Sequence, residues 1–175
     1  MNVQQFWALI DATLGTENPS ESLTKVLEIL APEEIIEFRL RHDDATLAAN
    51  TTNLGGVAHL ISGGTEDDGF YYFREWLVEM GSEVYHAALK NPDSLASLVT
   101  PGEVYEGEHG FSLVPVDVWC AKTGRSEDEF FTAVDLADAN NNRSDPNTGP
   151  SWDYNDKDEI RERFPNLAAK YLKPA

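Results

Sequence analysis

Apolar residues recur at helical spacing along most of the chain between residues 3 and 99. Residues 3–14 show the clearest example, with a stripe formed by Val3, Phe6, Trp7, Ile10 and Leu14. A spacing of three and four positions is typical of a helix that buries one face. The same pattern predicts helices over residues 20–30, 32–50, 51–61, 70–80 and 83–89, with a short helical segment at 95–99.

Several residues mark where these helices begin and end. Gly15 follows the first apolar stripe and is expected to end that helix. Ser20 is a suitable cap for the second helix, and Pro32 suits the first position of the third. The adjacent glycines Gly55 and Gly56 either weaken the fourth helix or mark close packing against it.

The helix at residues 70–80 is expected to lie at the centre of the core. Phe70, Phe73 and Leu77 fall on one face, which Tyr72 and Trp76 widen. A wide apolar face is typical of a helix with neighbours on several sides.

The second half of the chain has a weaker pattern. Residues 101–110 and 138–150 are predicted loops, and residues 111–120 fit either a pair of strands or a short helix. We favour a helix from Pro115 to Lys122 that Gly124 closes. Ser126 and Glu129 form a capping box before another helix, and short helices are expected at 156–163 and 167–172. The sequence therefore predicts a mainly α fold: a single compact helical domain over residues 1–175, with a helical core at 1–99 and a loop-rich extension at 100–175 packed on it.

Composition and charge exclude several classes of protein. The chain has 175 residues, 13 Lys and Arg against 31 Asp and Glu, and a formal net charge of −18. This balance argues against nucleic acids and anionic membranes as partners. It fits either a basic partner or no charged partner at all, in which case the charge only keeps the protein soluble or reflects a salty habitat. One cysteine, Cys120, excludes a disulfide scaffold, and no apolar run approaches the length of a membrane span.

The first residues lack a basic segment followed by an apolar one. We therefore expect no signal peptide and a cytoplasmic location. Cys120 follows Trp119 in an apolar stretch, so its thiol is expected to be buried and inert.

The sharpest candidate for chemistry is the acidic turn formed by Glu66, Asp67, Asp68 and Gly69. Adjacent carboxylates can bind a hard cation or raise one another's pKa for acid–base catalysis. The simpler interpretation, which we favour, is that one Asp caps the following helix while the other acids lie at the positive end of its dipole.

Two other acidic clusters are weaker candidates. Asp138, Asn140 and Asn142 have the spacing of calcium ligands, but Arg143 and Gly149 stand where a calcium loop needs Gly and Glu. The second cluster combines aromatic rings with carboxylates and fits either a cation pocket or an ordinary helix start; it contains Trp152, Asp153, Tyr154, Asp156, Asp158 and Glu159. The four histidines show no zinc spacing, so we expect neither a metal nor a cofactor.

Three segments together resemble a widespread bacterial family described only as a domain of unknown function. The segments are residues 6–11 (FWALID), 61–77 (ISGGTEDDGFYYFREWL) and 91–95 (NPDSL), with residues 163–167 (RFPNL) near the end. Family members begin with F-W-x-L-I-D and carry S-D-D-G-F-x-x-F-R-x-W-L. Where many members have Cys-Ser before the paired Asp, this chain has Thr65 and Glu66, so a role for that thiol does not carry over.

The resemblance implies a bacterial, mainly helical, stand-alone domain and no transferable activity. It also marks the positions most worth testing as a binding site: Trp7, Asp11, Asp67, Asp68, Phe70, Arg74 and Trp76. Asp68 and Arg74 are close enough in sequence to form an ion pair at the helix start.

Three functions remain open from the sequence. The favoured one is a non-enzymatic, acidic interaction or regulatory domain, such as an immunity protein, that contacts a basic partner. The alternative is an enzyme or a binder of a small ligand or cation that uses Asp11, Asp67, Asp68 and Arg74, with no catalytic residue assigned. The third is a decoy that imitates the charge of DNA.

Overall fold

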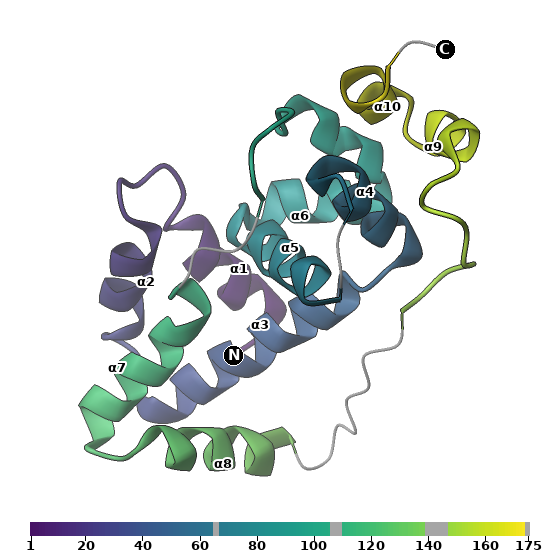
Figure 1. Ribbon diagram of the computed structural model, residues 1–175. Helices are drawn as coiled ribbons and strands as arrows, with labels where there is room; N and C mark the ends of the chain where they lie inside the picture. Colours follow the sequence, from purple (N-terminus) through teal and green to yellow (C-terminus); the bar gives the residue numbers. More distant parts are fainter. Residues whose placement is uncertain (65–66, 106–109, 139–146, 174–175) are drawn as a thin grey trace. The chain divides into compact units, whose positions relative to one another are not determined.

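The computed structural model describes residues 1–64, 67–105, 110–138 and 147–173, and helices form most of these residues (Figure 1). The α-helices are α1 (Val3–Asp11), α2 (Pro19–Leu27), α3 (Pro32–Ala48), α4 (Thr52–Ser62), α5 (Asp67–Glu79), α6 (Gly81–Lys90), α7 (Val114–Thr123), α8 (Glu127–Asp138), α9 (Lys157–Arg163) and α10 (Pro165–Tyr171). Two short 3₁₀ helices are η1 (Pro92–Ser97) and η2 (Phe111–Leu113). The described residues contain no sheet, only an isolated bridge between Thr51 and Thr148. The mainly α class is confirmed.

The helices group into two compact units. The first unit is Met1–Leu47 with Glu108–Asp145, and the second is Ala48–Gly107 with Pro146–Ala175. Each unit combines an early segment of the chain with a later one. Whether the chain folds as one domain stays a prediction.

Aromatic side chains dominate the interior of the first unit. Phe6 on α1 lies 5.2 Å from Phe38 on α3, and Trp119 on α7 lies 5.6 Å from Phe130 on α8, measured between ring centroids. All four side chains are at most 3% exposed. In Figure 1, α7 lies between α2 and α8, and it contacts both. Burial of large rings is the main contribution to the stability of such a unit.

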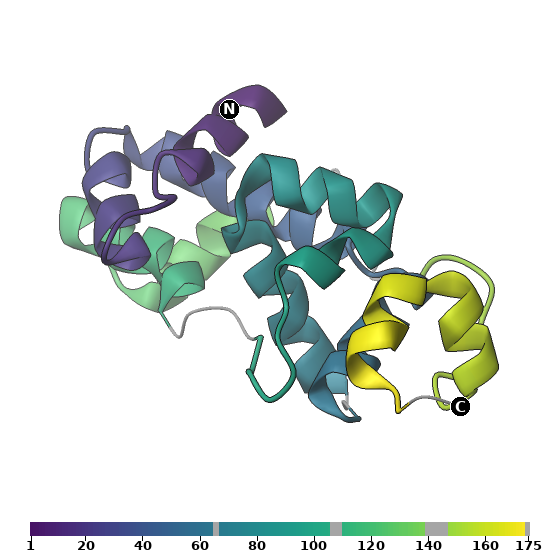
Figure 2. The ribbon, with the colours of Figure 1, turned by 90° about the horizontal axis from the view of Figure 1, so that it is seen from above.

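The second unit is held together by a buried carboxylate. Asp93, in η1, accepts hydrogen bonds from the backbone amides of Asn166 (3.1 Å) and Leu167 (2.9 Å) and from the Asn166 side chain (2.7 Å). Asp93 is 5% exposed. The carboxylate thereby satisfies amides in the first turn of α10, as an N-cap residue does, although it comes from 73 residues away in the sequence. Figure 2 shows α9 and α10 side by side in this unit.

Gly55 and Gly56 permit close packing against α4. A Cβ atom at Gly56 would lie 2.1 Å from the Trp152 ring, and one at Gly55 would lie 2.7 Å from the Tyr154 hydroxyl. Arg163 covers the Trp152 ring at 4.9 Å and bonds to Glu159 at 2.9 Å. Trp152 and Tyr154 are therefore packing residues.

Several predicted boundaries are wrong. Asn18, not Ser20, caps α2, because its side chain accepts the Glu21 amide at 3.0 Å. The first helix ends at Asp11, and Leu14 is 46% exposed beyond it. Tyr72 does not widen the buried face of α5, since it is 41% exposed.

Other local predictions are confirmed. Residues 114–123 form a helix that the left-handed Gly124 ends at φ 70°, not a pair of strands. The capping box is present, with the Glu129 amide donating to the Ser126 hydroxyl at 3.3 Å and the Ser126 amide donating to the Glu129 carboxylate at 3.1 Å.

Candidate functional site

The seven residues marked by the family resemblance divide between the two units. Trp7 and Asp11 lie on α1 in the first unit, whereas the other five lie on α5 in the second. Trp7 is 7% exposed and packs edge-on against Phe6 at 4.9 Å. Asp11 is half-buried at the end of α1. A shared role for Asp11 and the α5 acids stays a prediction.

On α5 the structure brings Arg74 together with two aromatic rings. Its guanidinium lies 5.1 Å from the centre of the Phe70 ring and 5.5 Å from that of Tyr71. Arg74 is 5% exposed, and the next residue, Glu75, is 6% exposed. A guanidinium stacked on rings loses much of its water, so this arrangement is typical of a structural residue. Asp68 is exposed in the first turn of α5.

The acidic turn itself is described only in part. Glu66 and the side chain of Asp67 lie outside the described residues, and the α5 backbone begins at Asp67. A helix that begins at Asp67 has Asp68 in its first turn, next to the positive end of the α5 dipole. The proposal that one of them caps the helix stays a prediction.

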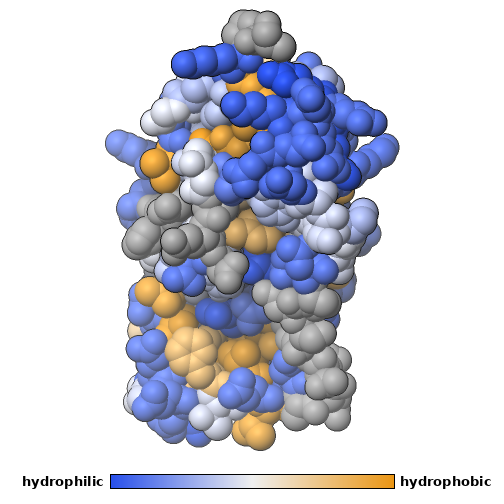
Figure 3. All heavy atoms as spheres, turned by 45° about the vertical axis from the view of Figure 1, so that its right-hand side comes forward, coloured by the Kyte–Doolittle hydropathy of each residue, from blue (hydrophilic) through white to orange (hydrophobic). Residues whose placement is uncertain are grey.

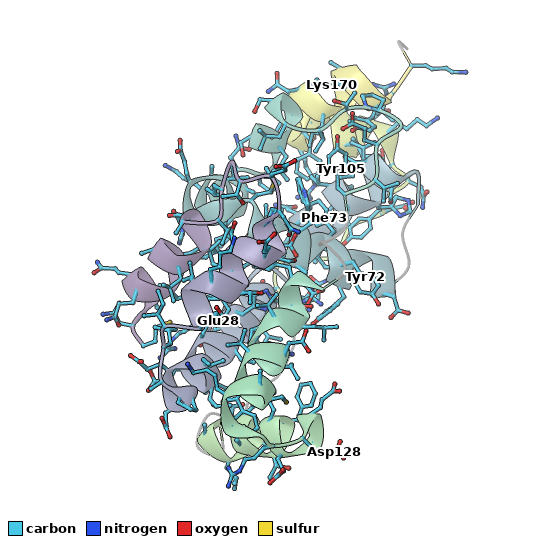
Figure 4. All side chains as sticks on the ribbon, turned by 90° about the vertical axis from the view of Figure 1, so that its left-hand side faces the viewer. Glu28, Tyr72, Phe73, Tyr105, Asp128 and Lys170 are labelled. Carbon is cyan, nitrogen blue, oxygen red and sulfur yellow. The ribbon has the colours of Figure 1, made fainter. Side chains whose placement is uncertain are left out.

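A hollow of about 630 Å³ lies in the second unit beside this turn. Its walls come from the last turn of α4, the beginning of α5, the loop after η1 and the end of α10; the residues are Ala58, 60–64, Gly69, Phe73, 102–105 and Tyr171. Figure 4 labels Phe73 on α5 and Tyr105 on the loop. The size is within the range of small-ligand sites.

Tyr105 and Glu103 form a bonded pair at the edge of the hollow. The Tyr105 hydroxyl donates to the Glu103 carboxylate at 2.8 Å and accepts the Thr100 backbone amide. The Tyr105 ring lies 5.1 Å from the ring of Trp76. These contacts fix the ring of Tyr105 on the α5 side of the hollow.

Tyr171 supplies a second phenol. Burial, with the nearby Tyr105 and Glu103, raises the pKa of Tyr171 to about 12, so its hydroxyl stays protonated. The hydroxyl oxygen is buried and has no hydrogen-bond partner among the described residues. A buried polar atom without a partner costs free energy, and a ligand that bonds to it would recover that cost.

These groups suit binding of a positive charge. A carboxylate, the faces of aromatic rings and the carbonyl end of a helix each attract cations. The hollow therefore has the chemistry of a cation-binding site lined with aromatic rings.

Other titratable groups have structural explanations. Partial burial, together with Glu127, Asp117 and Glu129, raises the pKa of the Cys120 thiol, so the thiol is held in its unreactive form. Across the described ranges, no three His, Cys, Asp or Glu side chains come close enough to hold a metal ion. None of the described helices is both long and apolar enough to cross a membrane.

Sequence reasoning missed most of the hollow. The sequence predicts a loop at Glu103 and Tyr105 and the end of a short helix at Tyr171. A loop with a tyrosine and a carboxylate two residues apart is a weak signal, because it does not indicate which distant ring it will face. Gly69 and Phe73, which line the hollow, lie next to the marked residues Asp68 and Arg74 in the sequence, but the resemblance itself marks neither of them.

Comparisons with known proteins identify one family. A family model described as a protein of unknown function (DUF4240) matches residues 1–116, about two thirds of the chain. The match includes the first unit's α1 and the whole of α5. No curated protein and no solved structure matches the chain.

Proposed function

The chain belongs to the DUF4240 family of proteins of unknown function, and on that premise we propose that it is an acidic interaction or regulatory domain that contacts a basic partner. The observation that carries the proposal is the net charge of −18. Such a charge attracts a basic protein over a distance and repels nucleic acid.

Exposed carboxylates in the first unit support this function. Glu127, Asp128 and Glu129 are exposed in the first turn of α8, where Asp128 projects outward in Figure 4. Glu33 on α3 and Arg125 before α8 line one hollow of about 320 Å³, so the acidic beginnings of the two helices are neighbours. We call Glu33 and residues 127–129 the α8 acidic surface.

On the face drawn in Figure 3, hydrophilic residues cover most of the surface, and apolar residues form separate patches, of which the broadest lies in the lower half of the view. An interaction on such a surface depends on charge more than on burial of apolar area. It is therefore expected to weaken as salt screens the charges.

Capture from a bacterial lysate tests the function. The immobilised chain should retain a protein of high isoelectric point at low salt and release it as salt rises. The variant E127Q/D128N/E129Q should retain less of it. The triple variant D153N/D158N/E162Q removes the same charge from the second unit and is the matched control for a general charge effect.

Competition separates this function from a DNA decoy. A decoy would lose its partner to added double-stranded DNA, whereas a dedicated interaction domain would keep it. If only acidic or neutral proteins are retained, or if retention does not depend on salt, the proposed function is wrong.

The family resemblance supports a bacterial origin, and the single thiol, Cys120, supports a cytoplasmic location. In that setting, an acidic domain that neutralises a basic protein would act as an immunity or regulatory protein. Such pairs are encoded side by side, so a neighbouring gene for a basic protein would support this part of the proposal.

A further inference from the structure

We propose that the hollow between α4, α5 and α10 receives a lysine or arginine side chain of the basic partner. Glu103 supplies the opposing charge, and the rings of Tyr105 and Tyr171 supply the walls. This inference rests on the proposed function and adds a contact in the second unit to the one assigned to the α8 acidic surface.

Two negative features favour a cation in this hollow. The first is Glu103, which is exposed at its edge and is held in place by the Tyr105 hydroxyl at 2.8 Å. The second is α4, an 11-residue helix whose last turn forms one wall. The carbonyl end of a helix carries partial negative charge, so it attracts a cation.

The aromatic lining favours an organic cation over a metal ion. Tyr105, Tyr171 and Phe73 line the hollow, and ring faces attract ammonium and guanidinium groups. Val104 is 77% exposed at the edge, where it can cover the aliphatic stem of a long basic side chain. Metal sites need several oxygen, nitrogen or sulfur ligands, whereas most residues of these walls are glycines, aliphatic side chains and aromatic rings, with Glu103 as the one carboxylate among the described lining residues.

Tyr171 offers a hydrogen bond to the incoming group. Its buried hydroxyl oxygen lacks a partner in the part of the chain that the structure describes. As an acceptor it matches the N–H donors of a lysine or arginine head group. The neighbouring residue, Lys170, donates a hydrogen bond to the Val99 carbonyl at 3.1 Å. Its ammonium group is therefore bound outside the lining of the hollow.

A peptide titration tests the inference on the full chain. The probe is a glycine-flanked arginine peptide, and the control peptide has citrulline in place of arginine. Binding is followed by the indole N–H resonance of Trp76, whose ring lies 5.1 Å from Tyr105, with the W76F variant assigning the signal. We expect the arginine peptide to shift this resonance and the citrulline peptide to leave it unchanged.

Variants of the residues that line the hollow test whether the peptide binds there. E103Q should weaken binding roughly two- to five-fold, the size of an exposed charge pair. E83Q removes an exposed carboxylate from α6, outside the lining, and should leave the affinity unchanged. Y105F keeps the ring and should bind better than Y105L. Equal binding by E103Q, E83Q and Y105L would overturn the inference.

The source of the cation is tested with free arginine. Binding of free arginine as tightly as the peptide would indicate a metabolite site and would overturn the assignment to a protein side chain. The captured basic partner gives a separate test. If it binds E103Q and Y105L with the same affinity as the native chain, the assignment of the contact to this hollow is wrong, but the proposed function is not contradicted. Absence of any basic partner would remove the function itself.

Discussion

At the scale of single residues, the least expected feature is the burial of two titratable side chains, one of which, Asp93, also holds a distant segment. Asp93 and His42 are 5% and 3% exposed, respectively. Burial makes each of them sensitive to substitution or to pH, because a polar group away from water depends on its few partners. The burial of these two residues cannot be predicted from the local sequence pattern, since each lies in an otherwise ordinary helical segment.

Replacing Asp93 with Asn should destabilise the second unit by about 2 kcal/mol. Three N–H donors of Asn166 and Leu167 share its carboxylate, and an amide would present a donor to one of them. Urea unfolding followed by circular dichroism measures the loss. The D135N variant, an exposed position on α8, is the control and should unfold as the native chain does. Equal loss in both variants would contradict the role given to Asp93.

His42 should make the protein less stable as pH falls below neutrality. Burial, with the nearby Arg39, lowers the pKa of His42 from 6.5 to about 3, so the folded state holds the ring neutral while the unfolded state binds a proton. Stability from this group is complete above pH 6.5 and decreases by roughly 1.4 kcal/mol per pH unit between 6.5 and 3.

Unfolding midpoints of the native chain and of the H42Q variant, compared at several pH values, isolate the effect of this group. The native curve should be steeper than that of H42Q between pH 6 and pH 4. Parallel curves would show that His42 is not neutral in the folded protein.

At the scale of helices, the apolar pattern predicted most elements, and what it missed depends on tertiary contact. The helices at residues 52–62 and 114–123 follow from periodicity and from Gly63 and Gly124. The adjacent glycines Gly55 and Gly56 signal close packing on α4, but nothing in the local sequence indicates that Trp152 packs there, because Trp152 and Gly56 are far apart in sequence. For the same reason the hollow cannot be predicted from the sequence, because its three aromatic rings come from three separate segments of the chain.

Replacing Gly56 with Ala should destabilise the protein by roughly 1–3 kcal/mol, because the new Cβ would lie 2.1 Å from the Trp152 ring. In a W152A background the same substitution should cost little or even stabilise α4, since alanine is the better helix former. A double-mutant cycle of thermal or urea unfolding measures the coupling. An equal cost in both backgrounds would mean that Trp152 does not occupy this position.

At the scale of the whole molecule, net charge is the property that distinguishes this chain. Helical packing of this kind is common, but 31 acidic against 13 basic residues is not needed for folding. The charge raises self-repulsion in the folded state and favours association with an opposite charge. This charge is the basis of our proposal that the chain acts through its acidic surface.

The rate of association with the captured basic partner is the most direct test of that claim. Electrostatic attraction accelerates encounter and is screened by salt. We predict that the association rate constant falls by about ten-fold or more between low and physiological ionic strength, while the dissociation rate changes much less. A rate constant that does not change with salt would contradict the account.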